Sequence, residues 1–202
     1  DDIDNGSSAT TSANTTLIVN GAAGAWSGTT VVGGTGSDTV NIQQAAADTT
    51  VTLGSTVTAV EAFNVLDTTL SNTADVDVSI TTYATAATWD ASALDAGEDS
   101  TLNLTGATAA QTLIGGEGND ALTGGTKGDT ITGNGGVDAI NGGNGLDNIS
   151  AGAGNDTITA STEAAFSTSL GTDTVDAGAG TDTLAFSAAA TLTTAEVANI
   201  ST

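Results

Sequence analysis

Residues 115–159 read GGEGNDALT GGTKGDTIT GNGGVDAIN GGNGLDNIS AGAGNDTIT, which are five nine-residue units without a gap. An aspartate stands at the sixth place of every unit, and an aliphatic residue stands at the eighth. The aspartates are Asp120, Asp129, Asp138, Asp147 and Asp156, and the aliphatic residues are Leu122, Ile131, Ile140, Ile149 and Ile158. A fixed short period indicates a repeat architecture, in which each unit is one small element stacked on others like it.

Each unit combines two local signals. The glycines of its first half permit positive φ and therefore a tight turn. Its last three residues place one aliphatic side chain between two small residues, which is the pattern of a minimal strand with one inward side chain. Nine residues thus make one turn and one strand, and we expect two units to close one coil of a flattened spiral.

The same phase returns on both sides of the array. LGTDTVD and AGAGTDTLA place Asp173 and Asp182 at the sixth position again. The interval from Asp156 to Asp173 is one residue short of two units, which indicates a loop or a slipped turn between them. We expect Phe166 to fill a gap in the stack there. One more complete unit, GGTGSDTVN, stands far upstream and contains Asp38.

The part of the chain before the array consists of short runs rich in Val, Thr, Ile and Leu, such as TLIVN at 16–20 and VDVSI at 76–80. Gly, Asn, Asp and Ser separate these runs, so they predict short β-strands. Helix signals are confined to AAFSTSL at 164–170 and TTAEVANI at 193–200, where a helical turn is allowed after a Ser or Thr cap.

Glycine content divides the chain. Ten of the 27 glycines precede residue 115, and 17 lie between residues 115 and 180. We therefore expect three segments: an irregular parallel β-solenoid over 1–114, a regular roll over 115–185, and a capping segment of a truncated longer chain over 186–202. The expected fold class is all-β, a right-handed parallel β-solenoid that ends in a β-roll.

Composition excludes several functional classes. The chain has 24 acidic residues, one basic residue and a net charge of −23, with no His and no Cys. Nucleic acids and anionic lipids are bound by Lys and Arg, so we expect neither as a partner. No apolar run of about 18 residues is present, so we expect no membrane insertion. Without His or Cys, the usual nucleophile pairs and zinc sites are absent, and any metal must be bound by oxygen.

The aspartate spacing points to such a metal. If two units close a coil, the aspartates of units i and i+2 stack, which pairs Asp120 with Asp138, Asp129 with Asp147, and Asp138 with Asp156. Bare carboxylates at that spacing repel each other, whereas a divalent cation between them turns repulsion into coordination. Calcium suits the site because it accepts about six to eight hard oxygens, including backbone carbonyls, in loose geometry.

We therefore expect several calcium ions, held by aspartate carboxylates and by backbone carbonyls of the glycine-rich turns. The expected ligands are Asp38, Asp120, Asp129, Asp138, Asp147, Asp156, Asp173 and Asp182, together with Gly115, Gly116, Gly118, Gly124, Gly133, Gly135, Gly142, Gly143, Gly145, Gly152 and Gly154.

The units at 115–123 and 142–150 resemble in full the nonapeptide of the RTX proteins, the haemolysin-type calcium-binding repeat family. The resemblance extends over residues 115–185 and implies a parallel β-roll with calcium in its turns. Three positions depart from the pattern: Lys127 displaces the fourth-place glycine, Asn134 replaces a second glycine but tolerates left-handed φ, and Ala151 replaces a first glycine.

Upstream, VTAVEAFNVLD, ATWDASAL and STLNLTG resemble segments found between such repeats in bacterial surface-layer proteins and other large secreted RTX proteins. The two resemblances imply a structural segment of a secreted surface-layer protein, exported by type I secretion to the bacterial cell surface. Such a segment folds on extracellular calcium, self-associates into a lattice and attaches to a cell-surface glycan. The alternative is an RTX folding module of a secreted enzyme, or an adhesin stalk. No catalytic constellation is visible, so we expect no enzymatic activity.

Two groups of acidic residues allow a different interpretation, the carboxylate pair of a glycosidase. The first is Asp75 with Asp77, and the second is Asp95 with Glu98 and Asp99. We favour outward strand positions for the first group and a solvated loop for the second.

Three aromatic residues, Trp26, Tyr83 and Trp89, fit either a sugar-binding platform or fillers of the stack, and we favour fillers. For Asp38, calcium binding and its absence stay equally open. No aspartate stands in phase one unit away, although Asp48, one position further on than a full unit, is a possible partner through a bulge.

Overall fold

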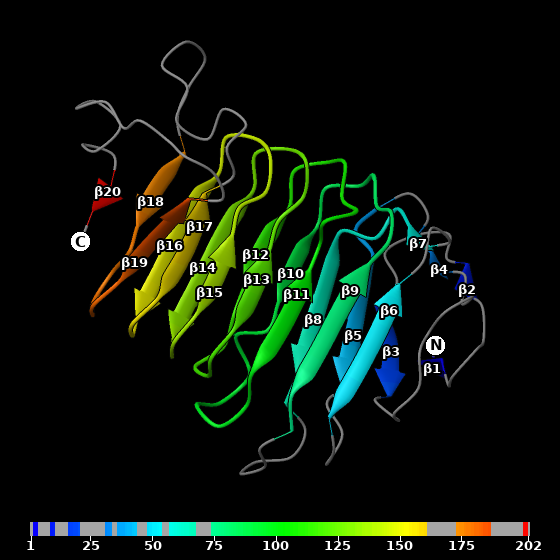
Figure 1. Cartoon of the computed structure of the whole chain (residues 1–202). Helices are drawn as coiled ribbons and strands as arrows, with labels where there is room; N and C mark the ends of the chain where they lie inside the picture. The colour runs from blue at the N-terminus through cyan, green and yellow to red at the C-terminus, as the bar shows by residue number, and fades with distance from the viewer. Residues whose placement is uncertain are drawn as a thin grey trace.

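The structure is a computed structural model of the chain. It describes residues 2–3, 9–10, 16–20, 31–33, 36–43, 48–53, 57–67, 74–160, 173–186 and 200–201. Every regular element in these ranges is a β-strand, and all pairings between strands are parallel. Figure 1 shows the strands stacked along one axis from the N-terminal to the C-terminal end. The fold is therefore an all-β parallel solenoid, as predicted.

The largest sheet has ten strands. In spatial order they are β1 (Asp2–Ile3), β3 (Thr16–Asn20), β5 (Thr39–Gln43), β8 (Ala62–Leu66), β10 (Thr88–Asp90), β12 (Thr112–Ile114), β14 (Thr130–Gly135), β16 (Asn148–Ala153), β18 (Thr174–Asp176) and β20 (Ile200–Ser201).

Two further sheets complete the coils. The seven-stranded sheet holds β6 (Thr49–Leu53), β9 (Val76–Ile80), β11 (Ser100–Asn103), β13 (Ala121–Thr123), β15 (Ala139–Asn141), β17 (Thr157–Ala160) and β19 (Thr183–Phe186). The three-stranded sheet holds β2 (Ala9–Thr10), β4 (Val31–Val32) and β7 (Val57–Thr58).

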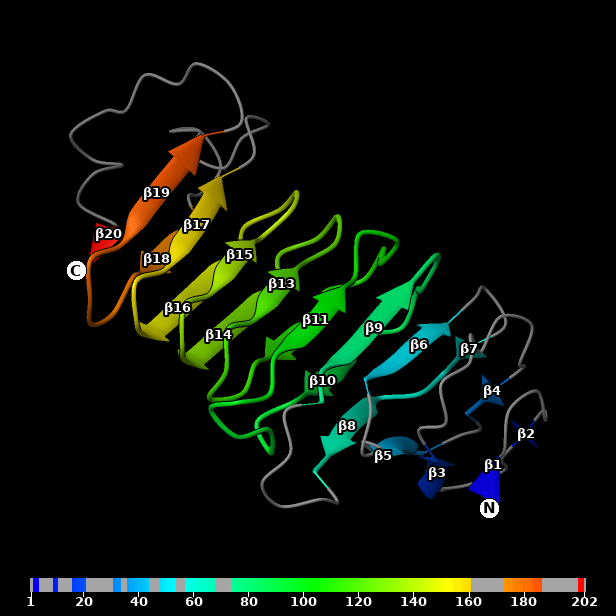
Figure 2. The same cartoon turned by 60° about the horizontal axis from the view of Figure 1, so that its bottom comes forward.

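The two large sheets meet at two edges. At the lower edge of Figure 1 the chain passes from the ten-stranded to the seven-stranded sheet, and at the upper edge it returns. Figure 2 turns the lower-edge loops towards the viewer. We keep the names lower edge and upper edge below.

Strand register gives the length of each coil. Thr112 pairs with Thr130, and Thr130 pairs with Asn148, so each of these coils takes two nine-residue units. The prediction that two units close one coil is thereby confirmed. Earlier coils are longer, since the step from Thr88 to its partner Thr112 exceeds two units.

The extra length of the earlier coils forms a third side at the upper edge. β7 lies on this side, and the parallel bridge between Tyr83 and Ala107 extends it by two coils. In the next coil the backbone N–H of Thr126 donates to the carbonyl of Ala107, so the third side ends in the glycine-rich turn of the repeat.

One coil of the array is enlarged. Asn148 pairs with Thr174, and this step is longer than the regular step from Thr130 to Asn148 by almost one full unit. The interval from Asp156 to Asp173 is therefore a single unit with an insertion, and not two units less one residue. Phe166 and the expected helical turn at 164–170 lie outside the described residues. So does the turn expected at 193–200, apart from Ile200 in β20.

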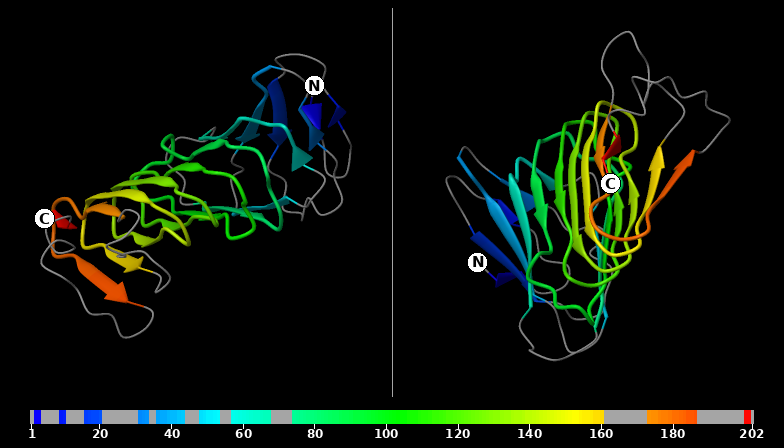
Figure 3. Two further views of the ribbon diagram at one scale, coloured as in Figure 1. Left: turned by 90° about the horizontal axis from the view of Figure 1, so that it is seen from above. Right: turned by 90° about the vertical axis from the view of Figure 1, so that its left-hand side faces the viewer.

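The inward side chains of the two large sheets form two facing ladders, and these side chains make up the core. One ladder is Val40, Phe63, Trp89, Leu113, Ile131, Ile149 and Val175, and the other is Val51, Val78, Leu102, Leu122, Ile140 and Ile158; all are buried. Figure 3 shows the two sheets facing each other across this layer. Each regular unit contributes one large aliphatic side chain to this layer, so the core is thin.

Aromatic side chains widen the core in the longer coils. Phe63 and Trp89 stack with ring centroids 3.8 Å apart, and Tyr83 packs edge-on against both rings. The Nε1–H of Trp89 donates to Oε1 of Gln111 over 2.9 Å. Tyr83 and Trp89 are thus fillers of the stack, as favoured above, whereas Trp26 lies outside the described residues.

Candidate metal centre

The sixth-place aspartates form two columns, one along each edge of the solenoid. Each aspartate immediately precedes a strand, so strand register stacks it on its counterpart one coil away. The lower-edge column is Asp120, Asp138, Asp156 and Asp182, and the upper-edge column is Asp129, Asp147 and Asp173. All are buried except Asp182 at the end, which is half-buried. The predicted stacking of units i and i+2 is confirmed.

Hydrogen bonds run along each column. The Oδ1 of each aspartate accepts from the backbone N–H of the aspartate one coil earlier, over 2.9 Å from Asp120 to Asp138 and 2.8 Å from Asp129 to Asp147. The same bond reaches Asp156, Asp173 and Asp182. Each carboxylate therefore fixes the turn of the preceding coil, much as a helix cap satisfies a backbone donor.

Both columns start on a residue that is not an aspartate. On the lower edge, the N–H and Oγ of Ser100 donate to Asp120 Oδ1 over 2.7 and 2.8 Å. On the upper edge, the N–H of Gln111 donates to Asp129 Oδ1 over 2.7 Å. Sequence reasoning missed these two positions, because neither belongs to a nonapeptide.

The remaining oxygen, Oδ2, differs between units. Asp120 Oδ2 accepts from the N–H of Gly116 over 2.7 Å, and Asp129 Oδ2 accepts from Gly125 over 2.6 Å. In contrast, Oδ2 of Asp138 and Oδ2 of Asp156 are buried without a hydrogen-bond partner. A buried carboxylate oxygen without a partner is costly, so these two positions call for a proton or a cation.

The backbone conformation of the turns differs between the first two units and the later ones in the same way. The second-place and fourth-place residues take positive φ in the later units: Asn134 with Gly136, Gly143 with Gly145, Gly152 with Gly154, and Gly178 with Gly180. Gly116, Gly118 and Gly125 in the first two units do not. The left-handed φ of Asn134, 77°, confirms that this residue serves in place of glycine.

Burial disfavours the charged form of these carboxylates. It raises the pKa of Asp138 to about 7; the hydrogen bond from the Asp120 N–H opposes the rise, and the charges of Asp120 and Asp156 add to it. Burial likewise raises the pKa of Asp147 to about 6. The pKa values of Asp120, Asp129 and Asp173 are raised by the same cause. A bound cation removes this penalty by neutralising the column.

Oxygen atoms converge at the first-place glycines. A Cβ added at Gly133 would lie 2.2 Å from both the Ala151 carbonyl oxygen and Asp138 Oδ2. At Gly124 it would lie 2.3 Å from the Gly142 carbonyl oxygen and 2.5 Å from Asp129 Oδ2. The space that a side chain would fill is thus lined by a carboxylate and a carbonyl from neighbouring coils. At Gly133, where Asp138 Oδ2 has no hydrogen-bond partner, this donor set fits calcium, which binds such oxygens at about 2.3–2.6 Å.

The other expected glycine ligands take several roles. A Cβ at Gly115 or Gly142 would also meet the Oδ2 of its own aspartate, whereas Gly116 turns its N–H towards Asp120. The Gly118 carbonyl lies against Gly136, and Gly135 lies beside the Glu117 carboxylate. In the part of the chain that is described, no three acidic side chains gather closely enough to hold a metal by themselves. Any metal at these positions would therefore also need ligands from the backbone carbonyls.

The upstream unit repeats this geometry at the upper edge, in coils that precede the upper-edge column. Asp38 is buried, and its N–H donates to Glu61 Oε2 over 2.8 Å, as the N–H of Asp129 does to Asp147. A Cβ at Gly33 would meet Asp38 Oδ2, as it would at the glycines of the array. The stacked neighbour of Asp38 is therefore Glu61, one long coil further on, which the nine-residue period did not reveal.

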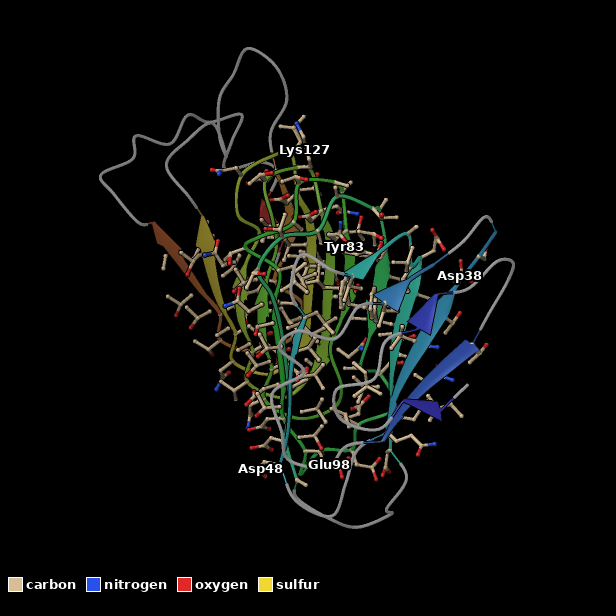
Figure 4. The ribbon with its side chains drawn as sticks, turned by 90° about the vertical axis from the view of Figure 1, so that its right-hand side faces the viewer. Asp38, Asp48, Tyr83, Glu98 and Lys127 are labelled. Atoms are coloured by element: carbon tan, nitrogen blue, oxygen red, sulfur yellow. The ribbon has the colours of Figure 1, made fainter. Side chains whose placement is uncertain are left out.

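Asp48 is not the partner of Asp38. Asp48 precedes β6 and belongs to the lower edge, and Figure 4 shows it at the opposite edge from Asp38. Successive sixth-place residues alternate between edges, so a residue about one unit away falls on the wrong side. Lys127 lies exposed at the upper edge, and Tyr83 lies between the sheets (Figure 4).

A second ladder of hydrogen-bonded aspartates runs along the lower edge, and the nine-residue pattern did not predict it. Asp48, Asp75 and Asp99 each accept, through Oδ1, from the N–H of the residue stacked on them one coil later, which is Asp75, Asp99 and Asn119 in turn. Asp77 points outward from β9, as favoured, whereas Asp75 lies just before that strand, and its carboxylate accepts from the N–H of Asp99.

The loop containing Asp95 is only partly solvated. Asp95 is exposed, but Glu98 is 1 % exposed, and its Oε2 accepts from the N–H of Asp95 over 3.0 Å. The expectation of a solvated loop is therefore wrong for Glu98, whose carboxylate folds back to close its own turn. Its other oxygen, Oε1, is buried without a partner.

Comparison with known families agrees with the geometry. Residues 114–149, 142–162 and 167–186 match the model of the RTX calcium-binding nonapeptide repeat (four copies). Within residues 114–186 the chain is thus similar to this calcium-binding repeat, and the fold that carries these residues is a parallel β-solenoid. No curated protein and no solved structure matched the chain. Among the described residues, no helix is long and apolar enough to cross a membrane.

Proposed function

We propose that this chain is a structural calcium-binding segment whose regular coils fold when calcium binds. The observation that carries the proposal is the pair of buried, unpartnered carboxylate oxygens at Asp138 and Asp156. Both belong to the lower-edge column of stacked carboxylates, and at Asp138 burial and the charges of Asp120 and Asp156 oppose ionisation. Bound calcium supplies positive charge and accepts these oxygens as ligands.

The ligands come from the set expected from the sequence: sixth-place aspartates whose Oδ2 receives no hydrogen bond from the turn, above all Asp138 and Asp156, and the carbonyls of the glycine-rich turns. The matching geometry at the upper edge of the earlier coils extends the proposal to Asp38, with Glu61 as the second carboxylate. We assign the regular roll to residues 115–185, the irregular solenoid to 1–114 and a capping role to 186–202.

The mechanism is linkage between binding and folding. An ion that binds only the folded form stabilises it by about 2.7 kcal/mol when its concentration is 100 times Kd. A few such ions match the net stability of about 5–15 kcal/mol typical of a domain. The regular coils bury only one large aliphatic side chain per strand, so they have little else to offset the entropy of folding.

The same linkage favours an extracellular location, because calcium is scarce in the cytosol and abundant outside. We assign the chain to a secreted bacterial protein of the surface-layer type, exported by type I secretion, assembled into a lattice and attached to a cell-surface glycan. An elongated stack of coils with continuous sheets suits such a structural role (Figure 1).

Two measurements test the proposal. Isothermal titration calorimetry should show several calcium ions per chain, with magnesium a poor competitor because it demands a tight octahedron. Absence of calcium binding would contradict the calcium function. Electron microscopy of the calcium-loaded protein should then show two-dimensional sheets. Monodisperse monomers would instead favour a stalk or a folding module of a secreted enzyme.

A further inference from the structure

The repeat array does not treat all its aspartates alike. We propose that the first coil of the array, residues 115–132, holds its aspartates without calcium. It then serves, with the longer coils before it, as a preformed template on which calcium builds the coils from Gly133 onward. This inference rests on the proposed calcium function and assigns different roles to units of one repeat.

In the first coil the protein itself satisfies both carboxylate oxygens. Asp120 accepts three hydrogen bonds, from the N–H and Oγ of Ser100 and from the N–H of Gly116. Asp129 accepts from the N–H groups of Gln111 and Gly125. An ionised carboxylate that receives two or three such bonds is stabilised without a metal.

In the following units the backbone of the turn no longer donates a hydrogen bond to the carboxylate. Asp138 and Asp156 keep one bond each, at Oδ1, from the preceding coil. Their Oδ2 atoms are buried and unpartnered. The second-place residues, Asn134 and Gly152, have turned to positive φ, whereas Gly116 and Gly125, which donate to the carboxylates of the first coil, have not.

The sequence accounts for half of this division. Unit 124–132 carries Lys127 where later units have a fourth-place glycine, and a residue with a Cβ is strained at positive φ. Unit 115–123 has both glycines, so its turn shape comes from what it stacks on. A Cβ at Gly116 would meet the carbonyl oxygens of Leu94 and Ala91, in a loop that is not a repeat.

The coils before the array supply a core that needs no metal. Phe63, Tyr83 and Trp89 pack together inside them, all at most 2 % exposed. Gln111 joins this core to the first coil: its side chain accepts from Trp89 and donates to the carbonyls of Thr85 and Ala109. Its backbone N–H donates to Asp129 Oδ1. The first coil is thus held in place by the preceding coils, which already have a core.

Hydrogen–deuterium exchange of the full chain, with and without calcium, tests the template. In chelator, peptic peptides within 74–132 should be protected, and peptides within 133–160 should exchange freely. Added calcium should protect the second set with little change in the first.

Two results would overturn the template. If calcium binds but both sets gain protection together, the template is wrong while the calcium function stands. If both sets are fully protected in chelator and calcium does not bind, both proposals fail.

A pair of matched variants adds an independent readout. Asp138→Asn should lower the number of calcium ions bound per folded chain, whereas Asp120→Asn should leave it unchanged, as measured by calorimetry in saturating calcium. The asparagine keeps an acceptor for the backbone N–H in both cases. Loss of an ion in Asp120→Asn would show that the first coil binds calcium and would refute its metal-free role.

Discussion

At the residue scale, one aspartate in each nonapeptide performs two tasks. Its Oδ1 caps the turn of the previous coil, and its Oδ2 faces the space at its own first-place glycine. The sequence period predicts both the aspartates and their stacking. It does not predict which Oδ2 is satisfied by the backbone, because that depends on neighbours such as Ser100 and Gln111, which stand outside the repeat.

A comparison within the lower-edge column tests the stacking. Asp138 lies between Asp120 and Asp156, whereas Asp182 is the last aspartate of the column and is half-buried. Asp138→Ala should therefore lower calcium stoichiometry and melting temperature more than Asp182→Ala. Calorimetry and thermal unfolding in calcium measure both effects. Equal losses in the two variants would argue against paired sites along the column.

Acidification should stabilise the metal-free roll. The folded pKa values of Asp138, about 7, and Asp147, about 6, lie above the ordinary value near 3.8. The folded form therefore holds protons that the unfolded form releases, and its stability falls as pH rises from about 4 to 7. In chelator, lowering the pH from about 7.5 to about 5 should increase the β signal in circular dichroism.

Calcium binding should respond to acid in the opposite way. Protons compete with calcium for the same carboxylates, so calcium affinity should fall as the pH is lowered over this range. A metal-free β signal that decreases on mild acidification would contradict the burial of these two groups.

At the element scale, the strands follow directly from short local patterns. TLIVN and VDVSI become β3 and β9 with the bounds expected, and each aliphatic eighth-place residue of the five-unit array enters the core. The third side of the early coils was not predictable, because β7 and the Tyr83 bridge are too short to stand out from a loop. Nor was Glu61 as the neighbour of Asp38, since the early coils have no fixed period.

The inward ladder should be sensitive to a single truncation. Ile140 is 1 % exposed and pairs in register with Leu122 and Ile158. Ile140→Ala in calcium should cost about 2–5 kcal/mol of unfolding free energy, because the thin core has no spare side chain to fill the cavity. Chemical denaturation provides the measurement.

Val137 offers a control in the same unit. It is 54 % exposed, so Val137→Ala should change the unfolding free energy by less than about 0.5 kcal/mol. Comparable losses in the two variants would show that burial along the ladder does not determine stability.

At the scale of the whole molecule, the structure shows where part of the net charge of −23 lies. The buried columns concentrate carboxylates along two edges, while the aromatic core lies in the coils before the array. We therefore expect one part of the chain to pack through apolar contacts and another to depend on bound cations. The enlarged coil before Asp173 shows that the stack tolerates an insertion without losing register.

The central claim is that calcium completes the fold, and a calcium titration followed by far-UV circular dichroism tests it most directly. In chelator the β signal should be incomplete, and it should rise to a plateau with calcium, while the same concentrations of magnesium should leave it largely unchanged. A β signal already complete in chelator, or an equal rise with magnesium, would contradict the account.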